Sequence, residues 1–306
     1  MTPPDPVSGG GARRRLAYRR FWARVGERFP DLGGAASTRF YAENEQRLFA
    51  EHFVPLAGLR LLKTDLWDEA KNTRILAWAA ERGARAYGVD ISEPIVLEAR
   101  IAFGSDALRC AVSDVRQLPF ADASFDAIYS MGTIEHFCGT ECALEEICRV
   151  LKPGGRAIIG VPNRHDPFLR PLLSAVLQAL GLYAYGYEKS YSRRTFRKML
   201  QGAGLTVLAE TAILFMPGWL RMLDLACHSW CRPLTRCTAA CVSLFVFLDR
   251  HITAVRKHGY LLATVVTKPD RSIQRTMPDG SADWPVAQNH GGQAARSVRY
   301  TRLDDP

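Results

Sequence analysis

The sequence lacks several features that would assign the protein to a class at once. No apolar run of signal-peptide type follows its Pro/Gly-rich start, so we expect a cytoplasmic chain with eight reduced cysteines. It contains no stretch of about 20 uninterrupted apolar residues, which a membrane-spanning helix requires. No cysteine pair has the CxxC spacing of zinc knuckles. Two i, i+4 pairs instead predict small apolar thiols on buried helix faces, at Cys227, Cys231, Cys237 and Cys241.

What the chain does contain is typical of a globular protein. Its 306 residues are 47% hydrophobic and 23% charged, enough for one large domain with an added cap. The net charge of +9 reflects clustered arginines near the N-terminus and again between Arg193 and Lys198. Such charge is either a solvated surface or the complement of an anionic lipid or phosphate-bearing partner. Nucleic acid is not predicted, because no nucleic-acid-binding motif accompanies the charge.

Strands and helices alternate along most of the chain. This alternation predicts an α/β protein with a largely parallel sheet and helices on both faces. We expect strands at 59–66, 84–92, 111–115, 125–130, 156–161, 205–213 and 259–266. We expect helices at 14–29, 38–53, 75–81, 92–102, 142–151, 168–182, 192–202, 217–230 and 235–255. Residues 152–155, which read Lys-Pro-Gly-Gly, should stop the helix before the strand at 156.

These elements predict one domain at 14–267, flanked by disordered segments at 1–13 and 268–306. Within it, residues 214–256 read as a helical insertion that is unusually apolar. Three interpretations stay open for the insertion: a hydrophobic substrate cap, a surface that lies on a membrane, or ordinary core packing or a dimer face.

The stretch from Leu108 to Val161 carries a family resemblance. Its segments "SDVRQLPFADASFDAIYSMGTIEHF" and "ALEEICRVLKPGGRAIIGVPN" resemble class I S-adenosylmethionine-dependent methyltransferases, and the resemblance extends from about Leu59 to Gly204. It implies a Rossmann-like seven-stranded sheet with an antiparallel last strand, and S-adenosylmethionine as cofactor. It also implies methyl transfer to a small-molecule or lipid-like acceptor, with the N-terminal helices closing over the cofactor.

One motif departs from the family. After its first strand the family has a glycine-rich loop, because the backbone must approach the methionine part of the cofactor closely. Here no glycine lies between Gly58 and Gly83. In one interpretation the acids Asp65, Asp68 or Glu69 bind the ammonium group of that methionine part. In the other, the site has degenerated and the chain is a non-catalytic binding or scaffold protein.

Asp90 lies at the carboxyl end of the second predicted strand, followed by Ile91. An acid at this point can accept hydrogen bonds from both ribose hydroxyls, as in Rossmann-type sites. The alternative is a surface or capping carboxylate. Ser92 can cap the helix that follows, and both roles are compatible.

Asp114 and Val115 end the third predicted strand. By the resemblance, Asp114 accepts from the adenine amino group and Val115 offers its backbone N–H to the ring; the alternative is a turn-forming aspartate. Ser130 and Met131 end the fourth strand and are expected to line the cofactor near its methyl group. Asp126 begins that strand and is expected to be structural.

Glu135 and His136 form the candidate catalytic pair. Histidine can act as a general base on a hydroxyl substrate, or it can be a positional residue near the cofactor. Some family members bind a divalent metal through E-x-x-E-H, but the first position here is Gly132, so no metal is predicted. The expected partner is a small-molecule or lipid acceptor, and contact of the insertion with a membrane surface stays one of the alternatives.

Overall fold

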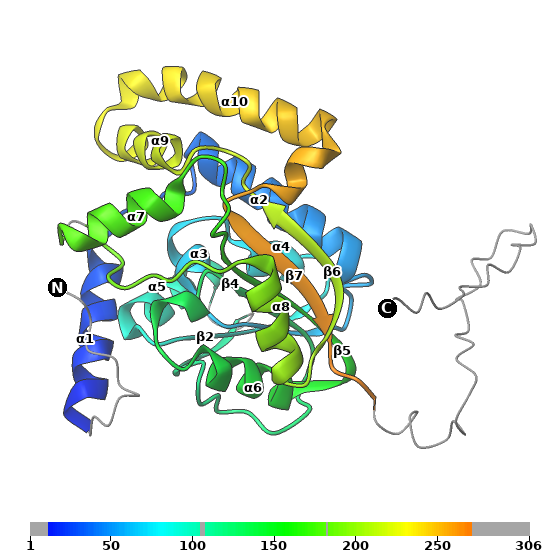
Figure 1. Ribbon diagram of the computed structural model, residues 1–306. Helices are drawn as coiled ribbons and strands as arrows, with labels where there is room; N and C mark the ends of the chain where they lie inside the picture. Colours follow the sequence, from blue (N-terminus) through cyan, green and yellow to red (C-terminus); the bar gives the residue numbers. More distant parts are fainter. Residues whose placement is uncertain (1–11, 105–107, 182, 271–306) are drawn as a thin grey trace, which may run out of the picture. The chain divides into compact units, whose positions relative to one another are not determined.

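The computed structural model describes residues 12–104, 108–181 and 183–270, and its centre is a seven-stranded sheet (Figure 1). The strand order is β3-β2-β1-β4-β5-β7-β6. Only β7 runs antiparallel to its neighbours, so the expected Rossmann-like fold class is confirmed. The strands are β1 (Arg60–Lys63), β2 (Arg85–Asp90), β3 (Arg109–Val112), β4 (Phe125–Met131), β5 (Leu151–Pro162), β6 (Thr206–Ile213) and β7 (Leu261–Thr267).

Helices cover both faces of the sheet, as a parallel sheet requires. They are α1 (Ala12–Arg28), α2 (Ala36–His52), α3 (Trp67–Lys71), α4 (Ile75–Ala80), α5 (Glu93–Phe103), α6 (Thr140–Val150), α7 (Arg170–Ala179), α8 (Arg193–Gly202), α9 (Gly218–Trp230) and α10 (Thr235–His251). Short 3-10 turns lie at η1 (Ile134–His136), η2 (Arg232–Leu234) and η3 (Thr253–Lys257).

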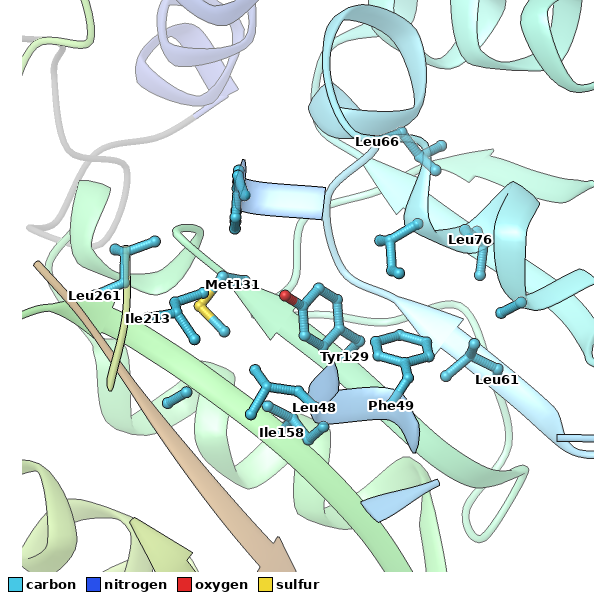
Figure 2. Close-up of a cluster of buried hydrophobic side chains, with 14 of the residues drawn as sticks. Leu48, Phe49, Leu61, Leu66, Leu76, Tyr129, Met131, Ile158, Ile213 and Leu261 are labelled. Atoms are coloured by element: carbon cyan, nitrogen blue, oxygen red, sulfur yellow. The ribbon is translucent and has the colours of Figure 1, made fainter. Parts of the chain in front are cut away.

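Two hydrophobic cores result, one on each face of the sheet. Alternation along β1 sends Leu61 into the core under α2, α4 and α5, and Leu62 into the core under α6 and α8. In the first core, the rings of Phe49 and Tyr129 meet edge to face at 5.0 Å, as Figure 2 shows. The Tyr129 hydroxyl donates to Oε1 of the buried Glu45 carboxylate at 2.8 Å, which gives a partner to each of these two oxygen atoms.

Helices α9 and α10 form a further layer beside α2 (Figure 1). Their two acids hold this layer in place. Asp224 accepts from the backbone N–H of Ser37 at 2.8 Å, and Asp249 pairs with Arg47 at 2.5 Å. With one side packed on α2, the other side of the layer faces outward.

The prediction for the start of β5 was wrong. Helix α6 ends at Val150, one residue before its predicted end, and the strand begins at once with Leu151 rather than at Arg156. Leu151 pairs with Phe125, and a shift of register absorbs the Pro-Gly-Gly segment. Gly154, at φ 74°, supplies the left-handed conformation of this bulge.

The prediction for the cysteines was wrong for three of the four. Cys227 is buried, but Cys231, Cys237 and Cys241 are exposed, because the α9–α10 layer packs on one side only. All eight described cysteines are free thiols.

The predicted ends of the chain fall mainly outside the described residues, which exclude 1–11 and 271–306. Ala12 and Arg13 belong to α1, so the helix begins two residues before the predicted boundary. Among the described helices, none is both long and apolar enough to cross a bilayer.

Candidate active site

A cavity of about 640 Å³ opens at the carboxyl ends of β1, β2 and β4 and after β3. This is where the strand order reverses, between β1 and β4, and where open α/β sheets bind ligands. Helices α1, α7 and α9 supply the opposite walls. Seven of the eight predicted site residues line the cavity: Asp65, Asp90, Ile91, Asp114, Val115, Met131 and His136.

Ser130 is the predicted residue that does not line the cavity. It is fully buried, and its hydroxyl accepts from Thr64 Oγ1 at 2.7 Å. Thr64, which precedes Asp65, itself lines the cavity. Ser130 therefore supports the wall from behind.

Asp90 is held by backbone groups at the end of β2. Its Oδ2 accepts from the N–H of Leu66 at 2.9 Å and its Oδ1 from the N–H of Ser92 at 2.8 Å. Burial raises the pKa of Asp90 to about 6, against these two hydrogen bonds, which favour the ionised form. Ser92 is the N-cap residue of α5, but its side chain makes no capping bond and its Oγ has no described partner. Each Asp90 oxygen keeps a lone pair for a ligand in the cavity.

Asp114 is fixed by Arg116. The guanidinium reaches both carboxylate oxygens, with Nε 2.9 Å from Oδ1 and Nη2 2.7 Å from Oδ2. The Arg116 backbone N–H also donates to Oδ1 at 2.9 Å. The next residue, Val115, is 5% exposed and adds an apolar side chain beside Asp114.

The glycine-free loop contains a buried cation. Lys63 is fully buried, and its Nζ lies 2.9 Å from Asp65 Oδ1 and 3.2 Å from Asp68 Oδ2. Asp65 also accepts from Thr133 Oγ1 at 3.1 Å. Burial raises the pKa of Asp65, and the lysine opposes that shift. The cluster of Lys63, Asp65 and Asp68 thus has two carboxyl groups for one ammonium group, and both acids line the cavity.

Glu69, the third acid of that loop, points elsewhere. Its carboxylate accepts from the N–H groups of Leu76 at 2.8 Å and Ala77 at 3.3 Å, which are unpaired donors of the first turn of α4. Burial raises the pKa of Glu69 to about 7. Glu69 therefore supports α4 and does not line the cavity.

A glycine on the neighbouring strand lets the glycine-free loop pack closely on the sheet. Leu66 packs against Gly88 of β2, where a Cβ would lie 2.4 Å from Leu66 Cδ2. Because Gly88 has no side chain, the loop after β1 can pack closely against β2 although the loop itself contains no glycine.

His136 lies in η1 and faces the cavity. Its Nδ1 is 2.9 Å from the backbone carbonyl of Tyr187, which can only accept, so Nδ1 carries the proton and Nε2 holds a lone pair. Burial lowers the pKa of His136, which favours this neutral form. The neighbouring Glu135 is 3% exposed, its Oε2 has no described partner, and burial raises its pKa well above the usual range.

Aromatic rings surround His136. Trp22 of α1 meets its ring at 5.0 Å, and Tyr185 lies 6.4 Å away. Phe29 stacks on Tyr185 at 5.3 Å and meets Trp67 at 5.2 Å. Much of the cavity wall near the histidine is therefore flat and apolar.

An ion pair closes the wall between α7 and the loop after it. Arg170 binds both oxygens of Glu188, at 2.6 and 3.0 Å, and the Tyr183 hydroxyl donates to the same carboxylate. Glu188, Glu135 and His136 each offer a ligand atom within 4.8 Å of the others, a spacing that could hold a metal ion. A cation there would have to compete with the Arg170 guanidinium, which already binds both oxygens of Glu188.

Sequence reasoning missed the far side of the cavity: Tyr18, Trp22, Phe29, Arg170, Tyr183, Tyr185, Glu188 and Arg221. These residues come from α1, α7, α9 and the loop before α8, and the sheet brings them together across long sequence separations. An apolar pattern marks their helices in the sequence, but it does not say which side faces the cavity.

Part of the chain matches a known family model. Residues 71–159 match the family model of a methyltransferase domain. The chain is 35% identical to the ubiquinone/menaquinone biosynthesis C-methyltransferase UbiE of Desulfotalea psychrophila, over 40% of this chain and 56% of that protein. It is 36% identical to methyltransferase GfsG of Streptomyces halstedii, over 45% and 50% of the two chains. It thus spans little more than half the length of these relatives.

A solved S-adenosylmethionine-dependent methyltransferase from Thermotoga maritima, described as a possible histamine N-methyltransferase, has the same fold. It superposes with a TM-score of 0.51 at 17% identity, over 76% of this chain and 91% of that one. The family match, the strand order and the cavity at the strand ends all indicate the same methyltransferase-like fold. Residues 71–159 are therefore similar to a methyltransferase domain, and the fold around them is the one found in solved S-adenosylmethionine-dependent methyltransferases.

Proposed function

We propose that the protein transfers a methyl group from S-adenosylmethionine to a small, apolar or lipid-like acceptor. The observation that carries this proposal is the placement of Asp90 and Asp114 at adjacent strand ends of one cavity, with His136 and a ring-lined wall in the same space. The two acids can accept hydrogen bonds from a nucleoside, and the apolar wall can contact an apolar acceptor.

The residues fit the cofactor along its length. Asp90 has free lone pairs for the ribose hydroxyls, and Asp114 can accept from the adenine amino group. Ile91 and Val115 supply apolar surface for the ring. At the methionine end, the excess carboxyl group of the Lys63–Asp65–Asp68 cluster favours an ammonium group, which supports the first interpretation of the glycine-free loop.

The acceptor side is apolar and aromatic. Phe29, Trp67 and Tyr185 present ring surfaces there, and α7 and α9 add aliphatic side chains. Relatives that are named for quinone methylation support an acceptor with a flat ring, and we infer that class for this chain.

When bound, the sulfonium of S-adenosylmethionine supplies an electrophilic methyl group. The protein's own part is to place the acceptor in line and to exclude water, which can account for much of such a rate enhancement. His136 can take the proton of an acidic hydroxyl or carbon at Nε2, because Nδ1–H is held by the Tyr187 carbonyl. The resulting imidazolium would lie beside Glu135 and Glu188.

Incubation with tritium-labelled S-adenosylmethionine and a panel of quinols, phenols and lipid extracts tests this proposal. Labelled product that disappears with Asp90→Ala supports it. The rival is a binding or scaffold protein on this fold, which predicts no labelled product from any acceptor and no effect of Asp90→Ala beyond stability.

A further inference from the structure

Helix α7 is apolar on two sides. Leu173 and Leu177 face the cavity. On the outside, an exposed stripe follows helical spacing, with exposed fractions between 47% and 65%: Leu169, Leu172, Val176 and Leu180. A helix that only covers a domain is expected to be polar on its outer side.

The neighbouring layer repeats this pattern. On α9 and α10, large apolar side chains point outward at roughly half exposure or more: Trp219, Met222, Leu223, Trp230, Leu244 and Phe247. Trp230 is 83% exposed. Figure 1 shows α7, α9 and α10 together at one end of the described chain, so we name their outward side the cap surface. Many large apolar side chains exposed on neighbouring helices are typical of an interaction site.

The cap surface is continuous with the cavity. Met222 and Trp230 are both exposed and part of the cavity lining, and α7 lines the cavity with the turns that carry its outer stripe. Whatever covers the cap surface therefore lies at the cavity mouth.

The charge on the cap surface has one sign. Helices α7, α9 and α10 contain two acids, Asp224 and Asp249, and each is 1% exposed. Arg232 and Arg236, between and at the start of the last two helices, are exposed. A second copy of the chain would bring like charges to this surface, whereas an anionic surface would complement it.

We propose that the cap surface docks on an anionic membrane, with its leucines and tryptophans in the headgroup region and the arginines at the lipid phosphates. The cavity mouth then faces the bilayer. This docking does not depend on methyl transfer, but entry of a lipid-like acceptor directly from the membrane rests on the function proposed above.

Sedimentation with vesicles tests the docking. The full chain is mixed with vesicles of phosphatidylglycerol and phosphatidylcholine, or of phosphatidylcholine alone, at low and high salt. We expect binding to the anionic vesicles that weakens in high salt, and a blue shift of tryptophan emission on binding. Leu172→Glu should weaken binding at least tenfold, while Ile101→Glu on α5, an equally charged change at a 74% exposed site, should not.

Three results would overturn the proposal. The first is a wild-type chain that does not sediment with anionic vesicles. The second is equal binding by Leu172→Glu and Ile101→Glu. The third is a stable dimer in light scattering that Leu172→Glu dissociates, which would assign the cap surface to a second copy. Because both variants change exposed positions, thermal unfolding should confirm that each remains folded.

Discussion

Replacing Lys63 with methionine tests how the glycine-free loop holds its charges. The Lys63 ammonium is buried and donates to Asp65 Oδ1, Asp65 O and Asp68 Oδ2 at 2.9, 3.0 and 3.2 Å. Methionine is also unbranched and of similar length, so it removes the charge without leaving a large void. The two carboxylates then remain buried without their cation.

Leaving one partner of a buried ion pair uncompensated costs about 3–5 kcal/mol. We therefore expect the free energy of unfolding at pH 7 to fall by that amount. With a urea m-value of about 3 kcal/mol/M, the unfolding midpoint should drop by about 1–1.7 M. The variant Lys152→Met is the matched control, because Lys152 pairs with Asp126 at 39% exposure and should lose less than about 1 kcal/mol.

The stability deficit of Lys63→Met should shrink as the pH falls. Without Lys63, burial raises the pKa of Asp65 further above that of the unfolded chain, so the folded state binds protons more readily. The deficit should be complete at neutral pH and shrink as the pH falls toward about 4. Lys63→Met combined with Asp68→Asn should recover part of the loss at pH 7. If the Lys63→Met variant loses less than about 1 kcal/mol of unfolding free energy, Lys63 is not a buried, ion-paired lysine that is shielded from water.

Three further predictions concern the cavity. The affinity for S-adenosylmethionine should fall as the pH drops through about 6, where Asp90 takes up a proton; titration calorimetry between pH 5 and pH 8 measures this, and a flat profile would argue against an ionised partner for the ribose. His136→Asn should lower turnover by about 10²–10⁴-fold with any acceptor found while leaving cofactor affinity unchanged; equal turnover would make the histidine positional. Gly160→Ala should lower the melting temperature and alter cofactor binding, because the added Cβ would lie 1.9 Å from Met131 Sδ; wild-type behaviour would show that Met131 can move freely.

The sheet could be predicted because its strands follow strong local patterns. Alternating strands and helices placed six strands in parallel, and the resemblance placed the last one antiparallel, as found. The start of β5 could not be predicted from the sequence, because Pro-Gly-Gly indicates a break in the strand. The pairing of Leu151 with Phe125 joins residues that are far apart in the sequence.

The site could be predicted where it follows a strand end. Asp90 ends β2, Asp114 follows the end of β3 at Val112 by two residues, and both acids line the cavity. The pairing of Lys63 with Asp65 was missed, although the residues are two apart, because lysine at a strand end is usually exposed. The wall from Trp22 and Arg170 was missed because it depends on how helices pack across the sheet.

The measurement that tests the central claim most directly is isothermal titration of the folded protein with S-adenosylmethionine. We predict a dissociation constant in the micromolar range for the wild type, weakened about tenfold or more by Asp90→Ala, because a hydrogen bond to a charged group contributes about 1.5–3 kcal/mol. Asp126→Ala removes an aspartate that also accepts a backbone N–H, that of Arg60, but lies at the other end of the sheet, and it should bind like the wild type. No binding by the folded wild type, or equal binding by Asp90→Ala, would contradict the account.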